Sequence, residues 1–154
     1  MKTWIKVLIV TLVFGTIAFM TGSNTPVGEK IWPPSPDNHT PEGAQLALLM
    51  TMGAVEALAF GLGVAFIAWG WPLVKRFDVG PKGLAIATYL SISWLLVNWY
   101  PHTNLHIANG LDLWGLIGIE YGFHLTLVIA GLIVAMFFLR VLQQTPETSL
   151  PRAT

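Results

Sequence analysis

Four long apolar runs alternate with short polar segments along the chain. They cover about residues 5–22, 44–73, 83–100 and 113–141. An α-helix rises about 1.5 Å per residue and the hydrocarbon core of a bilayer is about 30 Å thick, so the last three runs are long enough to cross a membrane. The pattern predicts an all-α integral membrane protein with four transmembrane helices.

The first run is also compatible with a cleaved signal peptide. Its sequence, MKTWIKVLIVTLVFGTIAFMTGS, has a basic start, an apolar centre and small residues at its end. It contains no clear A-x-A cleavage site, so we favour a retained helix. If the segment is removed, three spans remain.

The basic residues indicate how the helices are oriented. All but one of those outside the C-terminal tail lie beside the same ends of the apolar runs: Lys2, Lys6, Lys75, Arg76, Lys82 and Arg140. The other two loops, 21–43 and 101–112, contain only Lys30. The positive-inside rule therefore predicts a multi-pass protein of the cell membrane with both termini in the cytoplasm. We expect residues 1–142 to form one membrane domain and residues 143–154 to form a disordered cytoplasmic tail.

Composition narrows the functions that remain possible. The chain is 54% hydrophobic and 10% charged, with a mean hydropathy of +0.64, which is typical of a protein whose partner is the lipid bilayer. Eight basic residues balance eight acidic ones, so no basic surface for nucleic acid is expected. The absence of cysteine excludes cysteine-ligated iron–sulfur clusters, thiolate-held zinc and c-type haem.

Two histidines lie in the segment between the third and fourth runs. Pro101 fits the first turn of a helix, Asn98 or Tyr100 fits its N-cap, and Gly110 fits its stop. We therefore predict a short interfacial helix before the last span. His102 and His106, four residues apart, would share one face of that helix.

Three further polar side chains fall within the apolar runs. Glu120 and His124 are also four residues apart, and Glu56 would lie at a depth similar to that of His124. Intramembrane acids usually face the interior of a bundle or a partner. The pattern predicts a metal site whose residues are His102, His106, Glu120, His124 and Glu56, with Asp112 close in sequence. Imidazole and carboxylate suit iron, copper or zinc, and the spacing does not choose among them.

Each part of this site also has a simpler explanation. The pair at 102 and 106 could be solvated, and the pair at 120 and 124 could bond only to each other. Glu56 could hydrogen-bond to Ser91, Ser93 or Asn98 on the third span.

Small residues form two further patterns. Gly118 and Gly122 have the GxxxG spacing, and Gly53, Ala57, Gly61 and Ala65 form a second stripe. If the acidic face of the last span points into the bundle, its glycine face is free for another chain. We therefore expect a homo-oligomer or an association with other membrane subunits.

Together these features favour a metal-binding membrane protein, as a subunit of a membrane oxidoreductase or a metal-handling complex. Two alternatives stay open: a non-catalytic accessory subunit, and an anchor subunit for quinone or haem. Haem is disfavoured because His124 alone among the histidines lies within a predicted span. No catalytic residue is assigned.

Overall fold

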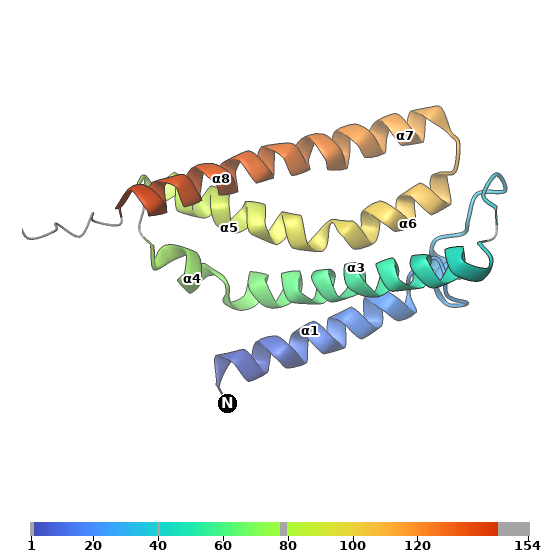
Figure 1. The fold of residues 1–154 in the computed structure, drawn as a ribbon, viewed down its shortest axis with the longest axis horizontal. Helices are drawn as coiled ribbons and strands as arrows, with labels where there is room; N and C mark the ends of the chain where they lie inside the picture. Colours follow the sequence, from blue (N-terminus) through green and yellow to red (C-terminus); the bar gives the residue numbers. More distant parts are fainter. Residues whose placement is uncertain (1, 40, 78–79, 145–154) are drawn as a thin grey trace, which may run out of the picture.

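In the computed structural model, residues 2–39, 41–77 and 80–144 are described, and regular secondary structure within them is helical throughout. Figure 1 shows the course of the chain. The helices are α1 (Thr3–Met20), α2 (Gly28–Ile31), α3 (Gly43–Trp69), α4 (Trp71–Lys75), α5 (Lys82–Val97), α6 (Trp99–Asn109), α7 (Leu113–Ile119), the π-helical turn η1 (Glu120–Leu125) and α8 (Thr126–Gln144). The predicted all-α class is confirmed.

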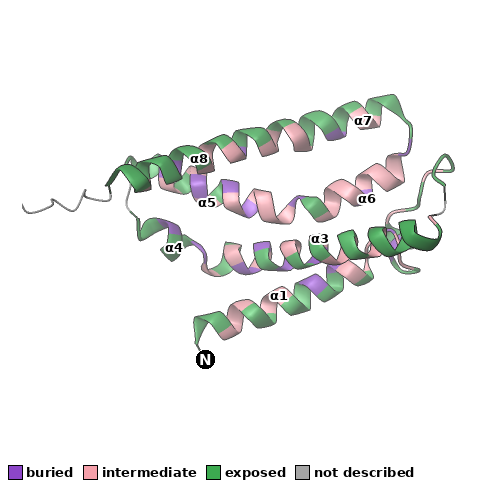
Figure 2. Ribbon diagram, in the orientation of Figure 1, coloured by how far each residue is buried: buried purple, intermediate pink, exposed green. Residues whose placement is uncertain are grey.

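The long helices lie side by side in a row. α7, η1 and α8 form one continuous arm, which packs on α5 and α6; α3 packs on α5 and α6 from the other side, and α1 packs on α3 (Figure 1). Exposed positions lie on the outer faces of the row, whereas buried positions concentrate between neighbouring helices (Figure 2). Large apolar side chains remain exposed on the outer faces, among them Leu132 at 66% and Leu142 at 69%. Such a surface is typical of a protein covered by lipid.

Three helices are long and apolar enough to cross a membrane: Thr3–Met20, Gly43–Trp69 and Leu113–Gln144. α5 is apolar but has only 16 residues. It therefore extends about 24 Å, short of the hydrocarbon core of a typical bilayer. A fourth span and the orientation of the termini stay predictions. The predicted tail begins at residue 143, whereas α8 includes Gln143 and Gln144; residues 145–154 lie outside the described part of the chain.

Helix α6 starts earlier than the sequence pattern suggests. We predicted a helix from Pro101, but α6 begins at Trp99 and follows α5 after a bend at Asn98 (Figure 1). Pro101 has no backbone N–H, so the carbonyl of Val97 loses its helical partner at this point. Asn98 does not cap α6 with its side chain; its Nδ2 instead donates to the Trp94 carbonyl at 2.7 Å. The predicted stop is confirmed, because Gly110 follows α6 with a positive φ of 58°.

The last helix is interrupted where a straight α-helix is expected. Residues Glu120–Leu125 form a π-helical turn between α7 and α8. Hydrogen bonds in such a turn join residues five apart, which widens the turn and changes the direction of the side chains within it. Side chains on the two sides of η1 therefore do not follow the 100° rotation per residue of a straight α-helix. Both Glu120 and His124 lie in this turn.

The small residues of α3 form the contact with α1. A Cβ atom at Gly61 would overlap the carbonyl oxygen of Thr11, and one at Gly15 would lie 3.2 Å from the Ala57 carbonyl oxygen. Ala57 and Ala65 are buried at 2% and 0% exposure. The middle of the α3 stripe is thus covered within the chain, because small side chains allow two helices to approach closely.

Candidate metal centre

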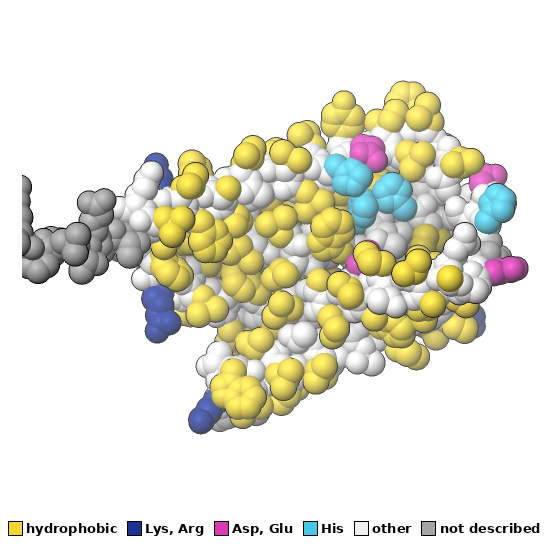
Figure 3. Space-filling model, viewed as in Figure 1, with side chains coloured by type: hydrophobic (Ala, Val, Ile, Leu, Met, Phe, Trp, Pro, Cys, Tyr) yellow, Lys and Arg dark blue, Asp and Glu magenta, His cyan; other side chains and the backbone are white. Residues whose placement is uncertain are grey.

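Three histidines from two elements meet near the end of the bundle opposite α4. α6 contributes His102 and His106, and η1 contributes His124. Figure 3 shows histidine side chains clustered beside an acidic group, at the far end from most of the visible Lys and Arg side chains. The i, i+4 spacing aligns the α6 pair, and packing of α6 against the α7–η1 arm supplies the third ring.

The three imidazole rings approach one another through their Nε2 atoms. His102 Nε2 lies 3.0 Å from His124 Nε2 and 3.2 Å from His106 Nε2. One nitrogen from each of the three residues falls within 4.8 Å of the other two. Sequence reasoning anticipated that these histidines could meet, but not that their Nε2 atoms would converge.

Hydrogen bonding alone does not satisfy this arrangement. An imidazole Nε2 carries either one hydrogen or one lone pair, so it makes one well-directed hydrogen bond. His102 Nε2 is approached by two nitrogens. A cation that accepts electron pairs from all three rings would satisfy every Nε2 at once.

Glu120 orients His124 by contacting the ring nitrogen that does not face the other two histidines. Its carboxylate contacts His124 Nδ1, on the opposite side of the ring from the shared Nε2 cluster. A carboxylate accepts a hydrogen bond, so Nδ1 carries the hydrogen and a neutral His124 presents a lone pair at Nε2. Metal-binding histidines commonly have such a carboxylate partner on their second nitrogen. The structure thus places Glu120 beside the cluster and not within it.

The cluster is half-buried and open on one side. The side chains of His124 and Glu120 are 43% and 54% exposed. His102 is more enclosed, with the rings of Trp99 and Phe123 close to its own. Its Nδ1 is buried and has no hydrogen-bond partner within the described residues.

His102 lies on α6, outside the three long apolar helices. Burial, followed by the neighbouring His106 and His124 rings, lowers the pKa of the His102 imidazole, while the Glu120 carboxylate raises it by a smaller amount. The neutral ring is therefore favoured. Neutral imidazole is the form that binds a metal ion.

The donor set fits a transition-metal ion. Bonds of 2.0–2.1 Å from a tetrahedral ion to imidazole nitrogens imply separations of about 3.3 Å between neighbouring ligand atoms. Two separations in the cluster, 3.0 and 3.2 Å, are close to this value, and all three ligand nitrogens lie within 4.8 Å of one another. Three protein ligands would leave at least one coordination position for water or a substrate.

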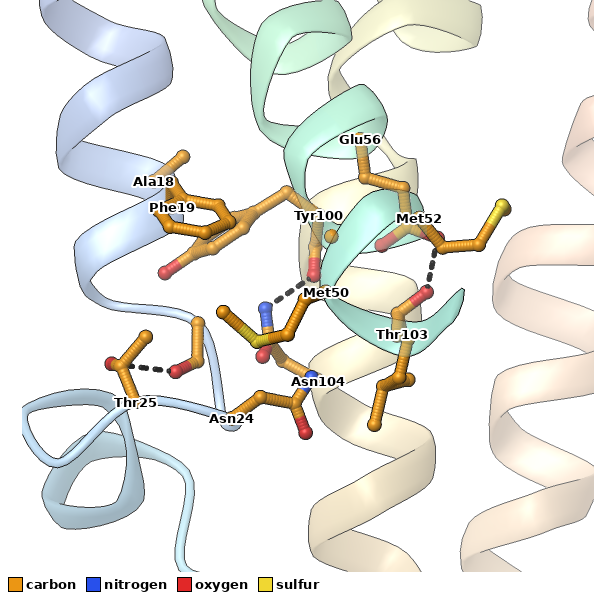
Figure 4. A pocket seen from close by; sticks show the side chains of 13 residues that line it. Ala18, Phe19, Asn24, Thr25, Met50, Met52, Glu56, Tyr100, Thr103 and Asn104 are labelled. Atoms are coloured by element: carbon orange, nitrogen blue, oxygen red, sulfur yellow. Dashed lines mark hydrogen bonds between the residues drawn. The ribbon is translucent and has the colours of Figure 1, made fainter. Parts of the chain in front are cut away.

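Glu56 is not among the described residues whose ligand atoms converge. Its Oε1 accepts a hydrogen bond from Thr103 Oγ1 at 2.8 Å, which joins α3 to α6. Among the described residues Glu56 has this partner and not Ser91, Ser93 or Asn98, the alternatives that the sequence suggested. Figure 4 shows the pair at the edge of a small cavity between α1, α3 and α6. The cavity has a volume of about 30 Å³, enough for about two water molecules.

Neighbouring residues on α6 make a structural network that the sequence did not reveal. Asn104 Oδ1 accepts from the backbone N–H of Ser23 at 2.6 Å. The hydroxyl groups of Tyr100 and Thr21 lie 2.7 Å apart. These partners belong to the segment after α1, 79 to 81 residues away, so no local pattern could have identified them.

Two other polar candidates lie outside the cluster. Asp112 caps α7, since its Oδ2 accepts from the Gly115 N–H at 2.7 Å. His39 is exposed in the loop between α2 and α3.

Comparison with protein families, with curated proteins and with solved structures finds no match to this chain. The functional argument therefore rests on the site itself.

Proposed function

We propose that this protein is a membrane metalloprotein that binds one transition-metal ion through Nε2 of His102, His106 and His124. The observation that carries the proposal is the convergence of these three atoms, two pairs of which are 3.0 and 3.2 Å apart. Glu120 acts as an orienting residue for His124. Imidazole ligands suit iron, copper and zinc.

We further propose that the protein works as a subunit of a membrane oxidoreductase or a metal-handling complex. The open side of the cluster supports this, because a site with three protein ligands and partial exposure can receive a further ligand or pass on the metal. The convergent geometry argues against a haem anchor. Two axial histidines would need to face each other across a macrocycle, whereas these Nε2 atoms nearly touch.

The two glycines on the last arm support association with another chain. A Cβ atom at Gly118 or at Gly122 would meet no described atom within 4 Å, and both glycines are exposed, so the described residues cover neither position. A partner helix could approach closely there. This feature also supports the alternative of a non-catalytic accessory subunit.

The decisive experiment is elemental analysis of detergent-purified protein with an optical spectrum of each sample. The variants are His106→Ala/His124→Ala and, as a matched control, His39→Ala, which removes the histidine outside the cluster. We expect about one metal ion per chain in the wild type and in the control, and none in a double variant with wild-type helicity.

Two results would count against the proposal. Equal metal content in the double variant would place any metal elsewhere. A wild type that stays metal-free after loading with iron, copper and zinc in turn would favour the accessory subunit. In that case, alanine at Glu120 or His124 should weaken assembly and leave the metal content unchanged.

A further inference from the structure

A large apolar groove lies at the opposite end of the molecule from the histidines. It has a volume of about 540 Å³ and lies between the first half of α1 and the region where α3 meets α4. Beyond the close contact at Gly15 and Gly61, α1 separates from its neighbour toward the N-terminus (Figure 1). A volume of this size is in the range of small-molecule and cofactor sites.

The groove has an apolar interior and a polar rim. Val7, Leu62 and Phe66 contribute apolar walls, and Ala65, fully buried, lies among the lining residues. Trp69 and Arg76 also line the groove, with Thr3 on the α1 side. Tryptophan is enriched at the level of lipid headgroups. Arg76 is exposed, and its guanidinium matches the geometry of a phosphate.

Positive charge surrounds this end of the bundle. Lys2 and Lys6 lie on or beside the start of α1, and Lys75 ends α4 beside Arg76. Figure 3 shows basic side chains both near the N-terminal end of α1 and near α4. The connection from α4 to α5 contains one acid, Asp78, so by sequence the bases outnumber the acids.

We propose that this groove binds one anionic phospholipid from the leaflet at the basic end of the protein. An acyl chain lies along the apolar walls, and the headgroup phosphate pairs with Arg76 at the rim. Basic pockets between membrane helices are suited to anionic headgroups. The site goes beyond the metal function and does not depend on it.

The test uses the full chain in a mild detergent and counts bound lipids by native mass spectrometry. The protein is titrated with phosphatidylglycerol or with phosphatidylcholine of the same acyl chains. We expect one phosphatidylglycerol to bind more tightly than phosphatidylcholine. Arg76→Gln should weaken phosphatidylglycerol binding about fivefold and weaken phosphatidylcholine binding less, because the choline cation of that headgroup already offsets the charge of its phosphate.

Two further variants separate the headgroup contact from the groove. Lys82→Gln removes one positive charge at the same end but outside the groove lining, and it should keep the wild-type preference. Val7→Trp fills the groove and should reduce the binding of both lipids. Bound metal and thermal unfolding, measured on the same samples, show whether each variant is folded and whether the metal site is intact.

Three outcomes would overturn the proposal. The first is equal binding of the two lipids to the wild type. The second is an Arg76→Gln variant that behaves like the wild type, or a Lys82→Gln variant that loses as much preference as Arg76→Gln. The third is displacement of phosphatidylglycerol by millimolar inorganic phosphate, which would identify the site as one for the free anion.

Discussion

Helix α6 carries two polar surfaces that differ in how their hydrogen bonds are completed. The surface toward α1 and α3 consists of Tyr100, Thr103 and Asn104. Each of these side chains meets a complementary partner: a hydroxyl group, a carboxylate and a backbone N–H, respectively. This surface is satisfied by the protein alone.

The surface toward the α7–η1 arm consists of His102 and His106, which meet His124. Here three nitrogens of the same type approach one another, and one of them is shared by two contacts. The contrast shows that polarity within a helical bundle does not by itself indicate a ligand. A ligand is indicated where the donors and acceptors of the protein do not match.

The largest expected effect is on the histidine surface. His102→Ala removes the nitrogen that contacts both others, so we expect metal affinity to fall by about 100-fold or more, beyond the loss typical of an orienting residue, because two remaining imidazoles form a poor site. Competition against a chromogenic chelator measures this affinity. The neighbouring variant Thr103→Ala should retain the metal, and a similar loss in both, accompanied by lost helicity, would show that α6 had unfolded.

A smaller effect on the same surface is expected from Glu120→Gln. The amide keeps the size of the side chain but removes its charge, which weakens the orientation and basicity of His124. We expect metal affinity to fall by about 10- to 100-fold, with the stability of the metal-free protein almost unchanged. An affinity equal to that of the wild type would show that Glu120 is only a neighbour of the ring.

On the satisfied surface, Asn104→Ala should affect stability and not metal binding. The N–H of Ser23 would lose its acceptor in a buried position, which costs about 1–3 kcal/mol. Fluorescence-detected thermal unfolding in detergent measures the change. A stable variant that instead loses its metal would contradict the separation of the two surfaces.

The smallest effect is expected from Thr103→Val, which removes the hydrogen bond to Glu56 with little change in shape. Side-chain hydrogen bonds between membrane helices average about 0.6 kcal/mol, so a small decrease in thermal stability is expected. Thr51→Val is the matched control, since the Thr51 hydroxyl donates to the Ala47 carbonyl within its own helix. A loss of metal affinity in Thr103→Val would indicate that Glu56 is coupled to the histidines.

Local patterns in the sequence predicted several parts of this structure correctly. The apolar runs correspond to α1, α3, α5 and the α7–η1–α8 arm, because helix formation follows runs of suitable residues within one segment. Gly110 terminates α6 as expected, since its positive φ is accessible to glycine. The four-residue spacing correctly paired Glu120 with His124.

Other features depended on how helices rotate and tilt against one another. The sequence pattern grouped Glu56 with the histidines from its depth alone, but the rotation of α3 directs its carboxylate to Thr103. Counting residues gives how far along a helix a side chain lies. Packing between helices decides in which direction around the helix axis that side chain points. The small residues illustrate the same limit: the middle of the α3 stripe packs on α1, whereas the described residues leave Gly118 and Gly122 uncovered.

The sequence by itself determined that this protein is helical, apolar and supplied with two imidazole-bearing segments. Those properties follow from composition and from spacings of a few residues. Only the tertiary structure decided that nitrogens of His102, His106 and His124 come within 4.8 Å of one another, which sets the Glu120–His124 pair beside a cluster. This outcome requires the contact between His102 and His124, 22 residues apart, which the packing of α6 on the last arm selects.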